Sequence, residues 1–127
     1  MVNNMAEIIK TLVRFSDISA ETIFSPASGS DYIKLDNADT RLMLIIKNGN
    51  TKNVTVKLKA GNGTLKELGD IVIIAEGSKT IAVPFSRIES ARVKLITGEN
   101  KGKVLIETEA DIGASLESLL MAVISVE

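Results

Sequence analysis

Hydrophobic and polar residues alternate with a period of two through most of the chain after Tyr32, and clusters of Gly, Asn and Asp interrupt the alternation at nearly regular intervals. This pattern is typical of strands that have one face against a core and the other in water. Val54, Val56 and Leu58 are expected to face the core, with polar residues between them facing water. Strands of this kind are predicted at three places: 53–59, 79–85 and 92–97.

Two further segments, 42–46 and 119–126, are apolar on both faces of a strand. Each is expected to be a central strand covered on both sides, or a strand that contributes to a subunit contact. Pro84 lies within the predicted strand 79–85 and favours a sheet edge or a bulge, because proline has no N–H to donate. Turn residues separate the strands at four places: 47–50, 61–63, 76–78 and 98–102.

About seven or eight short strands with regular turns predict an all-β fold, a single-domain antiparallel β-sandwich of jelly-roll-like or Ig-like type. We assign residues 32–127 to the sandwich core and residues 1–31 to an N-terminal arm, or to a first strand plus a loop. Apolar residues of this first part are spaced as in an amphipathic helix, but their β-branched content favours a strand or an extended arm. A free arm and a strand of the same sandwich are both open at this point.

The composition limits the classes of function that are expected, because the chain has no His, no Cys and no Trp. Histidine and cysteine supply much of the acid–base, nucleophilic and metal chemistry of enzymes, so their absence favours binding or assembly over catalysis, and no cofactor is expected. The net charge is −1 with no basic stripe, which argues against nucleic acid as a partner. The uncharged apolar stretch 119–124 is far shorter than the roughly 20 residues of a spanning helix, so we expect no membrane segment.

Glu107 and Glu109 are the clearest candidates for catalysis, since residues two apart on a strand project from one face about 7 Å apart. Paired carboxylates at such distances hydrolyse glycosides. A solvated strand face explains the same pair more simply. A sugar-binding cleft would also be expected to carry aromatic platforms, and the chain has one Tyr and three Phe.

Two loops contain residues that could hold ions. Residues 36–39, Asp-Asn-Ala-Asp, offer oxygen ligands for calcium, but they lack the EF-hand pattern and are better explained as an Asx-rich turn. Residues 61–63, Gly-Asn-Gly, lie between Lys59 and Lys66 and could suggest a phosphate loop. No Gly-Lys-Ser/Thr follows them, so a turn is the simpler interpretation.

The stretch from Leu42 to Val126 resembles a family of short proteins encoded among the virion structural genes of tailed bacteriophages and prophages. The order and spacing of several turn-and-strand pieces carry the resemblance. These pieces are Lys47-Asn48, 53–57, 59–63, Gly69-Asp70 leading into 71–73, 76–80, 83–85, 89–94 and 100–104, followed by an apolar strand.

This resemblance implies a compact β-sandwich without catalytic residues that acts as a capsid decoration or another minor virion component. The expected protein is therefore a non-enzymatic structural protein of the virion, made in the bacterial host cytoplasm and bound to the capsid exterior. Its expected partners are the major capsid protein and further copies of itself, for instance in a trimer. A tail or head–tail connector subunit is one alternative, and a carbohydrate- or surface-binding module is another.

Apolar residues near the two ends of the chain are the candidates for capsid or subunit contacts, because an extended apolar segment can add to a neighbouring protein. The candidate residues are Ile8, Ile9, Leu12, Val13, Leu119, Met121 and Val123.

Overall fold

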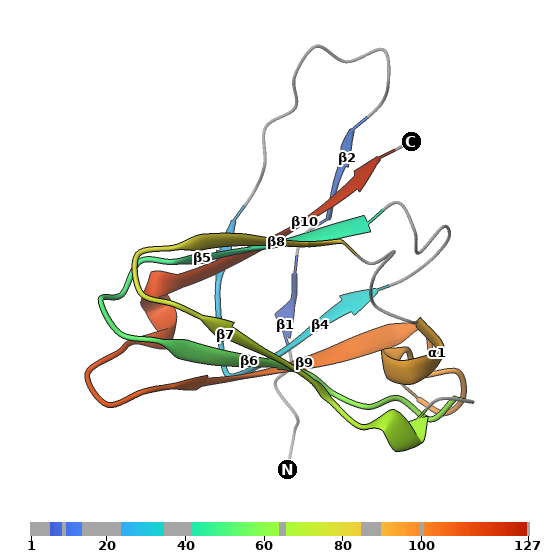
Figure 1. Ribbon diagram of the computed structural model, residues 1–127. Coiled ribbons are helices and arrows are strands. Elements are labelled where there is room, and N and C mark those ends of the chain that lie inside the picture. Colours follow the sequence, from blue (N-terminus) through green and yellow to red (C-terminus); the bar gives the residue numbers. More distant parts are fainter. Residues whose placement is uncertain are drawn as a thin grey trace.

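Two β-sheets pack face to face in the computed structural model of the chain (Figure 1). The structure describes residues 6–8, 10–13, 24–34, 42–63, 66–84, 90–99 and 101–126. The first sheet has the strand order β1 (Ala6–Glu7), β4 (Ser30–Lys34), β9 (Lys103–Ala110), β6 (Val54–Leu58) and β7 (Ile71–Ala75). The second sheet has the order β2 (Lys10–Val13), β10 (Leu119–Val126), β5 (Leu42–Asn48) and β8 (Thr80–Pro84), and β3 (Ser25–Pro26) also pairs with β10. The fold is therefore the all-β sandwich that the sequence predicts.

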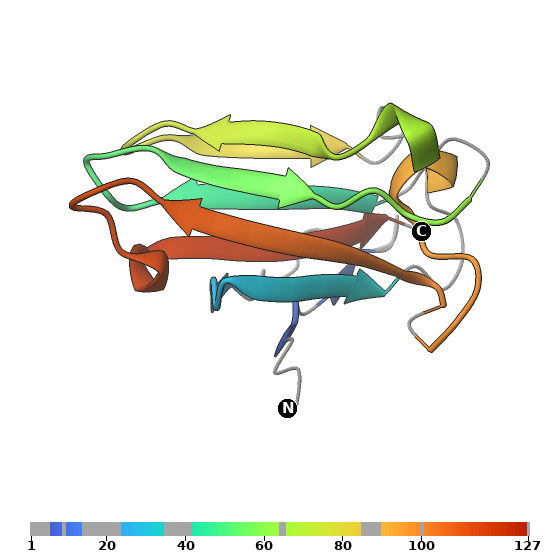
Figure 2. The same cartoon turned by 90° about the horizontal axis from the view of Figure 1, so that it is seen from below.

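Helical structure in the described residues is confined to short turns at the ends of the sandwich. These are α1 (Ser90–Val93) and the 3₁₀ turns η2 (Lys66–Leu68) and η4 (Leu116–Ser118). Figure 2 shows the two layers from below, with η2 and α1 beside one end of the strands.

The alternating pattern of β6 produces the arrangement expected from it. Val54, Val56 and Leu58 are fully buried, whereas Thr55 and Lys57 between them are only half-buried. Their neighbours in the core come from both sheets, so the core lies between the layers. The second sheet contributes Leu42, Leu44, Ile46, Leu119, Met121 and Val123 to this core.

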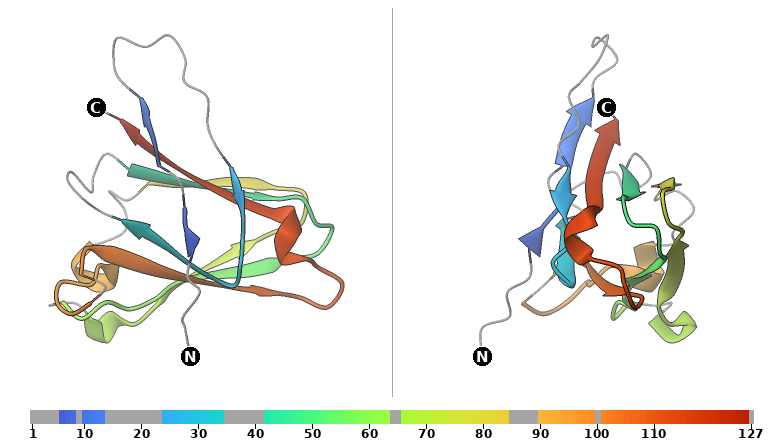
Figure 3. Two further views of the ribbon diagram at one scale, coloured as in Figure 1. Left: turned by 180° about the vertical axis from the view of Figure 1, so that it is seen from behind. Right: turned by 90° about the vertical axis from the view of Figure 1, so that its left-hand side faces the viewer.

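The N-terminal residues that the structure describes form edge strands of the chain's own sandwich. β1 pairs with β4, and β2 pairs with β10, in both cases in the parallel direction. Between them, Ile8 is buried, and its backbone N–H donates to the Tyr32 carbonyl oxygen at 2.9 Å. The sheets are consequently mixed, which corrects the expectation of purely antiparallel pairing. In the right panel of Figure 3, these strands lie along one side of the sandwich, and β7 and β8 lie along the other.

The predicted strand at 92–97 is wrong, because Arg92 and Val93 belong to the helical turn α1 and residues 94–97 are not in a strand. Val93 is still buried, as its apolar character suggested. The Arg92 guanidinium donates to the carbonyl oxygens of the segment 68–70 at 2.9 to 3.1 Å. In this helical turn, Val93 enters the core while Arg92 binds the segment that leads into β7. An alternation of apolar and polar residues with a period of two does not reveal such an arrangement.

Candidate functional site

The outward face of the first sheet is mostly polar on β4, β9 and β6 and carries the carboxylate pair noted in the sequence. In the register of β9, Glu107 is flanked by Ser30 of β4 on one side and Lys57 of β6 on the other. Glu109, one step along the same face, lies opposite Thr55. The odd-numbered residues of β9 point outward because side chains alternate along a strand. Each of the two carboxylates therefore lies beside polar residues of the neighbouring strands.

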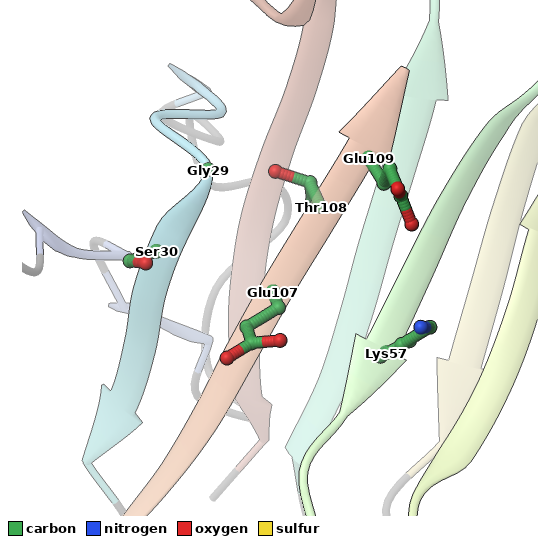
Figure 4. Close-up of a pocket in the computed structure, with 6 residues that line it drawn as sticks. All are labelled: Gly29, Ser30, Lys57, Glu107, Thr108 and Glu109. Carbon is green, nitrogen blue, oxygen red and sulfur yellow. The ribbon is translucent and has the colours of Figure 1, made fainter. Parts of the chain in front are cut away.

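A shallow depression of about 320 Å³ lies on this face where β4 and β9 begin to separate. Figure 4 shows Glu107, Thr108 and Glu109 in succession along β9, with Lys57 on the neighbouring strand β6. The lining residues are Gly29, Ser30, Lys57, Glu107, Thr108 and Glu109. Both glutamates are exposed, so this pair lacks the enclosure that glycosidases give to their catalytic carboxylates.

Thr108 has a different role from the glutamates on either side of it. Its side chain is buried, and its Oγ1 has no hydrogen-bond partner in the described part of the chain. Its backbone N–H donates to the Gly29 carbonyl oxygen at 3.1 Å. Thr108 therefore contributes to the joint between β4 and β9.

Lys59, beyond the end of β6, links this face to the segment before β7. Its Nζ lies 2.8 Å from Asp70 Oδ2 and 3.7 Å from Glu107 Oε2. The hydrogen bond to Asp70 raises the pKa of the Lys59 ammonium, although some burial opposes this shift. The same hydrogen bond, helped by the Ala60 backbone N–H, lowers the pKa of the Asp70 carboxyl. The cluster acts as a structural tie between β6 and the entry to β7.

Tyr32 lies on the same outward face as the depression, but its ring is already engaged. Lys103 Nζ lies 4.3 Å from the ring centroid, in the geometry of a cation–π contact. This contact covers one face of the ring. Tyr32 is therefore a weaker platform for a sugar ring than its type alone would suggest.

The outward face of the second sheet is apolar across its central strands. Met43 and Ile45 of β5 lie opposite Ile124 and Ala122 of β10, and Ile45 also lies opposite Ala82 of β8. These residues alternate with the core residues of the same strands. Met43, Ile45 and Ile124 are half-buried, Ala82 is exposed and Ala122 is fully buried. The remaining apolar members of this outward face are Pro84 and Leu120. We call the surface formed by Met43, Ile45, Ala82, Pro84, Leu120 and Ile124 the apolar face.

Four of the candidate contact residues of the sequence analysis do not lie on this face. Leu119, Met121 and Val123 are fully or almost fully buried in the chain's own core, as is Ile8. They are therefore not available for contacts with another protein. The outward positions of β10 are Leu120, Ala122 and Ile124, of which Leu120 and Ile124 are half-buried and Ala122 is fully buried. The sequence could not show whether the odd-numbered or the even-numbered residues of β10 face the core, because both sets are apolar. A shift of one residue in register exchanges the two faces of a strand.

The other N-terminal candidates are only partly placed. Leu12 and Val13 lie in β2, which pairs with β10 at Ser125 and Val126. Ile9 lies outside the described residues.

The two loops considered for ions have different outcomes. Residues 36–39 lie outside the described residues. In the loop 61–63, Asn62 Oδ1 accepts from the Ile96 N–H at 2.8 Å, and Asn62 Nδ2 donates to the Thr97 carbonyl oxygen at 3.2 Å. This loop holds the segment after α1, a use that its turn-like sequence did not reveal.

Within the described ranges, no group of three or more His, Cys, Asp or Glu side chains is arranged to hold a metal ion. None of the helices in the same part of the chain has the length and apolar character needed to cross a membrane.

Comparison with known proteins adds no relative to this picture: no protein-family model matches the chain, and no curated protein or solved structure matches it significantly.

Proposed function

We propose that this protein is a non-enzymatic structural protein of a phage virion that decorates the capsid exterior, with the major capsid protein as its partner. The observation that carries this proposal is the apolar face, which presents Met43, Ile45 and Ile124 outward from the middle of a sheet. A broad outward apolar surface is typical of a protein that binds another protein. The resemblance of residues 42–126 to virion structural proteins points in the same direction.

The two sides of the sandwich suit a protein held between a particle and water. The outward face of the first sheet carries Lys57, Glu107 and Glu109 and remains well hydrated. The apolar face of the second sheet is available for the capsid. Modest contacts are sufficient, because a capsid repeats the same site many times and a symmetric oligomer can engage several sites together.

The copy number of the chain in purified particles tests the proposal. Quantitative mass spectrometry of the phage or induced prophage that encodes the chain would compare it with the major capsid protein. Copies on the order of hundreds per particle support lattice decoration, whereas about six to a few dozen support a tail or connector subunit. Absence from particles would overturn the virion assignment.

Substitutions on the apolar face then test the docking surface. The double variant Ile45→Lys/Ile124→Lys places charge at outward positions of β5 and β10 and is expected to lower particle occupancy at least about tenfold. Ile112→Lys is the matched control, because Ile112 is 99% exposed and lies in the turn between β9 and η4, outside the strands. Equal occupancy of all three proteins would remove the apolar face from the capsid contact.

The polar depression favours a second candidate function, a module that binds a carbohydrate or another polar surface ligand. Ser30, Lys57 and Glu107 would supply donors and acceptors for such a ligand. A glycan array tests this function. Binding that is lost in Glu107→Gln and retained in Ile112→Lys would support it, and the absence of any bound glycan would contradict it.

A further inference from the structure

In the described part of the chain, no strand pairs with the outer edge of β7, and this open edge lacks the usual protection against pairing. β7 is the last strand of the first sheet and pairs with β6 on its inner side (Figure 2). Its sequence, Ile-Val-Ile-Ile-Ala, has no charged residue and no proline, and all but the last residue are β-branched. Natural edge strands usually carry lysine, proline or a bulge, because an unprotected edge recruits another strand.

Hydrogen-bond directions show which backbone groups of β7 face this edge. The Lys59 backbone N–H donates toward β9 at 2.9 Å. The backbone N–H and C=O groups of successive residues point to opposite sides of a strand. The groups of Val56 and the other even-numbered residues of β6 therefore form hydrogen bonds with β7. Val56 is opposite Ile73, so Ile73 bonds inward. The backbone N–H and C=O groups of Val72 and Ile74 consequently point to the open edge.

The neighbouring edge strand β8 differs in this respect. Asn48 donates its backbone N–H to the Lys79 carbonyl oxygen at 2.9 Å, so residue 79 bonds toward β5. By the same alternation, Pro84 has its nitrogen on the open edge of β8, where it has no hydrogen to donate. The second sheet is thus protected on the side where the first is not.

Exposed apolar side chains accompany the open backbone groups of β7. Val72 is 55% exposed and Ile74 is 49% exposed, both on the outward side of the sheet. Leu68, in the 3₁₀ turn just before the strand, is 56% exposed. Backbone groups and apolar side chains therefore offer the same partner, an extended and uncharged strand.

We propose that this partner is β7 of a second copy, paired antiparallel so that Ile73 of each chain lies at a two-fold axis. Val72 of one copy then lies opposite Ile74 of the other, and the two exchange backbone hydrogen bonds in both directions. On the core side, the large Ile71 lies opposite the small Ala75 of the second copy. The two copies of β7 thus match in their backbone hydrogen-bonding groups, in the apolar character of their side chains and in side-chain size. A two-fold interface requires a surface that is complementary to itself in this way.

The ends of β7 limit the pairing to this short stretch. The backbone carbonyl of Asp70, next in line on the open edge, already accepts from Arg92 at 2.9 Å. In the proposed register Asp70 would face Glu76 of the second copy, an unfavourable pair of like charges. The ion pair of Asp70 with Lys59 offsets this repulsion. A small interface of this kind predicts a concentration-dependent dimer rather than a trimer.

This pairing uses a different surface from the capsid contact and needs no virion. Purified full-length protein is therefore sufficient for the test, and failure of one proposal leaves the other standing. Sedimentation equilibrium from about 1 μM to about 1 mM is expected to show a monomer–dimer equilibrium. A protein that stays monomeric throughout this range would overturn the proposal.

Charge substitutions test the register. Val72→Lys/Ile74→Lys places like charges opposite each other and is expected to weaken the dimer at least about tenfold, whereas Val72→Lys/Ile74→Glu places opposite charges together and retains it. Ile112→Lys is the control for added charge alone. Equal association of the Lys/Lys variant and the unchanged protein, or equal weakening by Ile112→Lys, contradicts pairing through β7. Circular dichroism confirms that each variant is folded.

A disulfide provides a second test that does not depend on affinity. The natural chain has no cysteine, so a single introduced cysteine can only join two copies. Residues facing each other at a non-hydrogen-bonded antiparallel position have Cα atoms about 4.5 Å apart, within the range of a disulfide. Ile73→Cys is expected to form dimers under mild oxidation at least about tenfold faster than Ile112→Cys. Equal rates would overturn the proposed register.

Discussion

Asn48 joins the two sheets directly: its Nδ2 donates to the Ala75 carbonyl oxygen at 2.8 Å across the end of the sandwich. Asn48 is the last residue of β5 and is buried, and Ala75 is the last residue of β7. The same Nδ2 also donates to the Lys52 carbonyl oxygen at 3.0 Å. Its Oδ1 accepts from the backbone and side-chain nitrogens of Asn50, both at 2.9 Å. All the hydrogen-bonding capacity of this buried amide is thus used.

Asn48→Ala is expected to lower the free energy of unfolding by about 1–3 kcal/mol, because it removes the buried hydrogen bond to the Ala75 carbonyl oxygen and the further hydrogen bonds of the amide to Lys52 and Asn50. Urea unfolding followed by circular dichroism measures this change. Asn53→Ala is the control, since Asn53 is exposed and its side-chain oxygen accepts a long hydrogen bond of 3.3 Å from the Gly77 N–H. Equal losses in the two variants would contradict the special role of Asn48.

The Lys59–Asp70 pair predicts how stability depends on pH. The pKa of Asp70 is lowered from 3.8 in the folded protein, so its contribution is present above that value and is lost as the pH falls through the lowered pKa. The pKa of Lys59 is raised from 10.5, so its contribution is complete below that value and is lost as the pH rises through the raised pKa. The pair therefore stabilises the fold most between these limits.

Asp70→Asn removes the charge but keeps an oxygen for the Ala60 N–H, so it isolates the ion pair. Because both side chains are partly exposed, the expected loss near pH 7 is at most about 1 kcal/mol. Thermal unfolding between about pH 2 and 7 should show a flatter acid limb for the variant. An unchanged acid limb would mean that this pair does not contribute. A double-mutant cycle with Lys59→Met measures the coupling itself.

Gly61 packs against the backbone of the segment after α1. Its N–H donates to the Arg92 carbonyl oxygen at 2.8 Å, and a Cβ at this position would overlap the carbonyl oxygen of Lys94. Gly61→Ala is therefore expected to cost about 1–3 kcal/mol of unfolding free energy, because backbone atoms must move. Asn62→Ala removes the neighbouring side-chain hydrogen bonds without an overlap and should cost less. The reverse order of the two losses, measured by urea unfolding, would contradict this packing.

The inward and outward positions of β10 should respond differently to the same substitution. Met121→Lys buries an unpaired ammonium in the core and is expected to cost more than about 3 kcal/mol or to prevent folding. Ile124→Lys changes an outward, half-buried position and is expected to cost about 1 kcal/mol or less. Comparing expression and thermal unfolding of the two variants checks the assignment. Similar behaviour of both would show that the faces of β10 are wrongly assigned.

For strands with one polar and one apolar face, the local alternation of residues was sufficient to predict the strand and its buried side. The alternation around Val54, Val56 and Leu58 predicted both the existence of β6 and its buried side. Pro84 correctly indicated an edge strand, because a missing N–H is tolerated only there or at a bulge. The carboxylates Glu107 and Glu109 were likewise expected on a solvated face, and both are exposed.

For strands that are apolar on both faces, the sequence predicted the strand but not which face is buried. In β10, Met121 and Ile124 look alike to any pattern of hydrophobicity, and the difference between them depends on which face β6 and β9 cover. The N-terminal strands presented a related difficulty, because parallel pairing with β4 and β10 joins segments far apart in the sequence. The turn α1 was missed because its sequence also satisfies a strand period.

The sequence by itself determined that this chain forms an all-β sandwich, since the period of its apolar residues and the placement of its turn residues are local properties. It also placed polar side chains on one side of β6 and β9. The tertiary structure decided which side of β5 and β10 faces the core, that Asn48 bridges the sheets, and that β7 has an open edge while β8 is blocked by Pro84. These features depend on strand order and register, which arise when the whole chain buries its apolar surface together and are not encoded in any one segment.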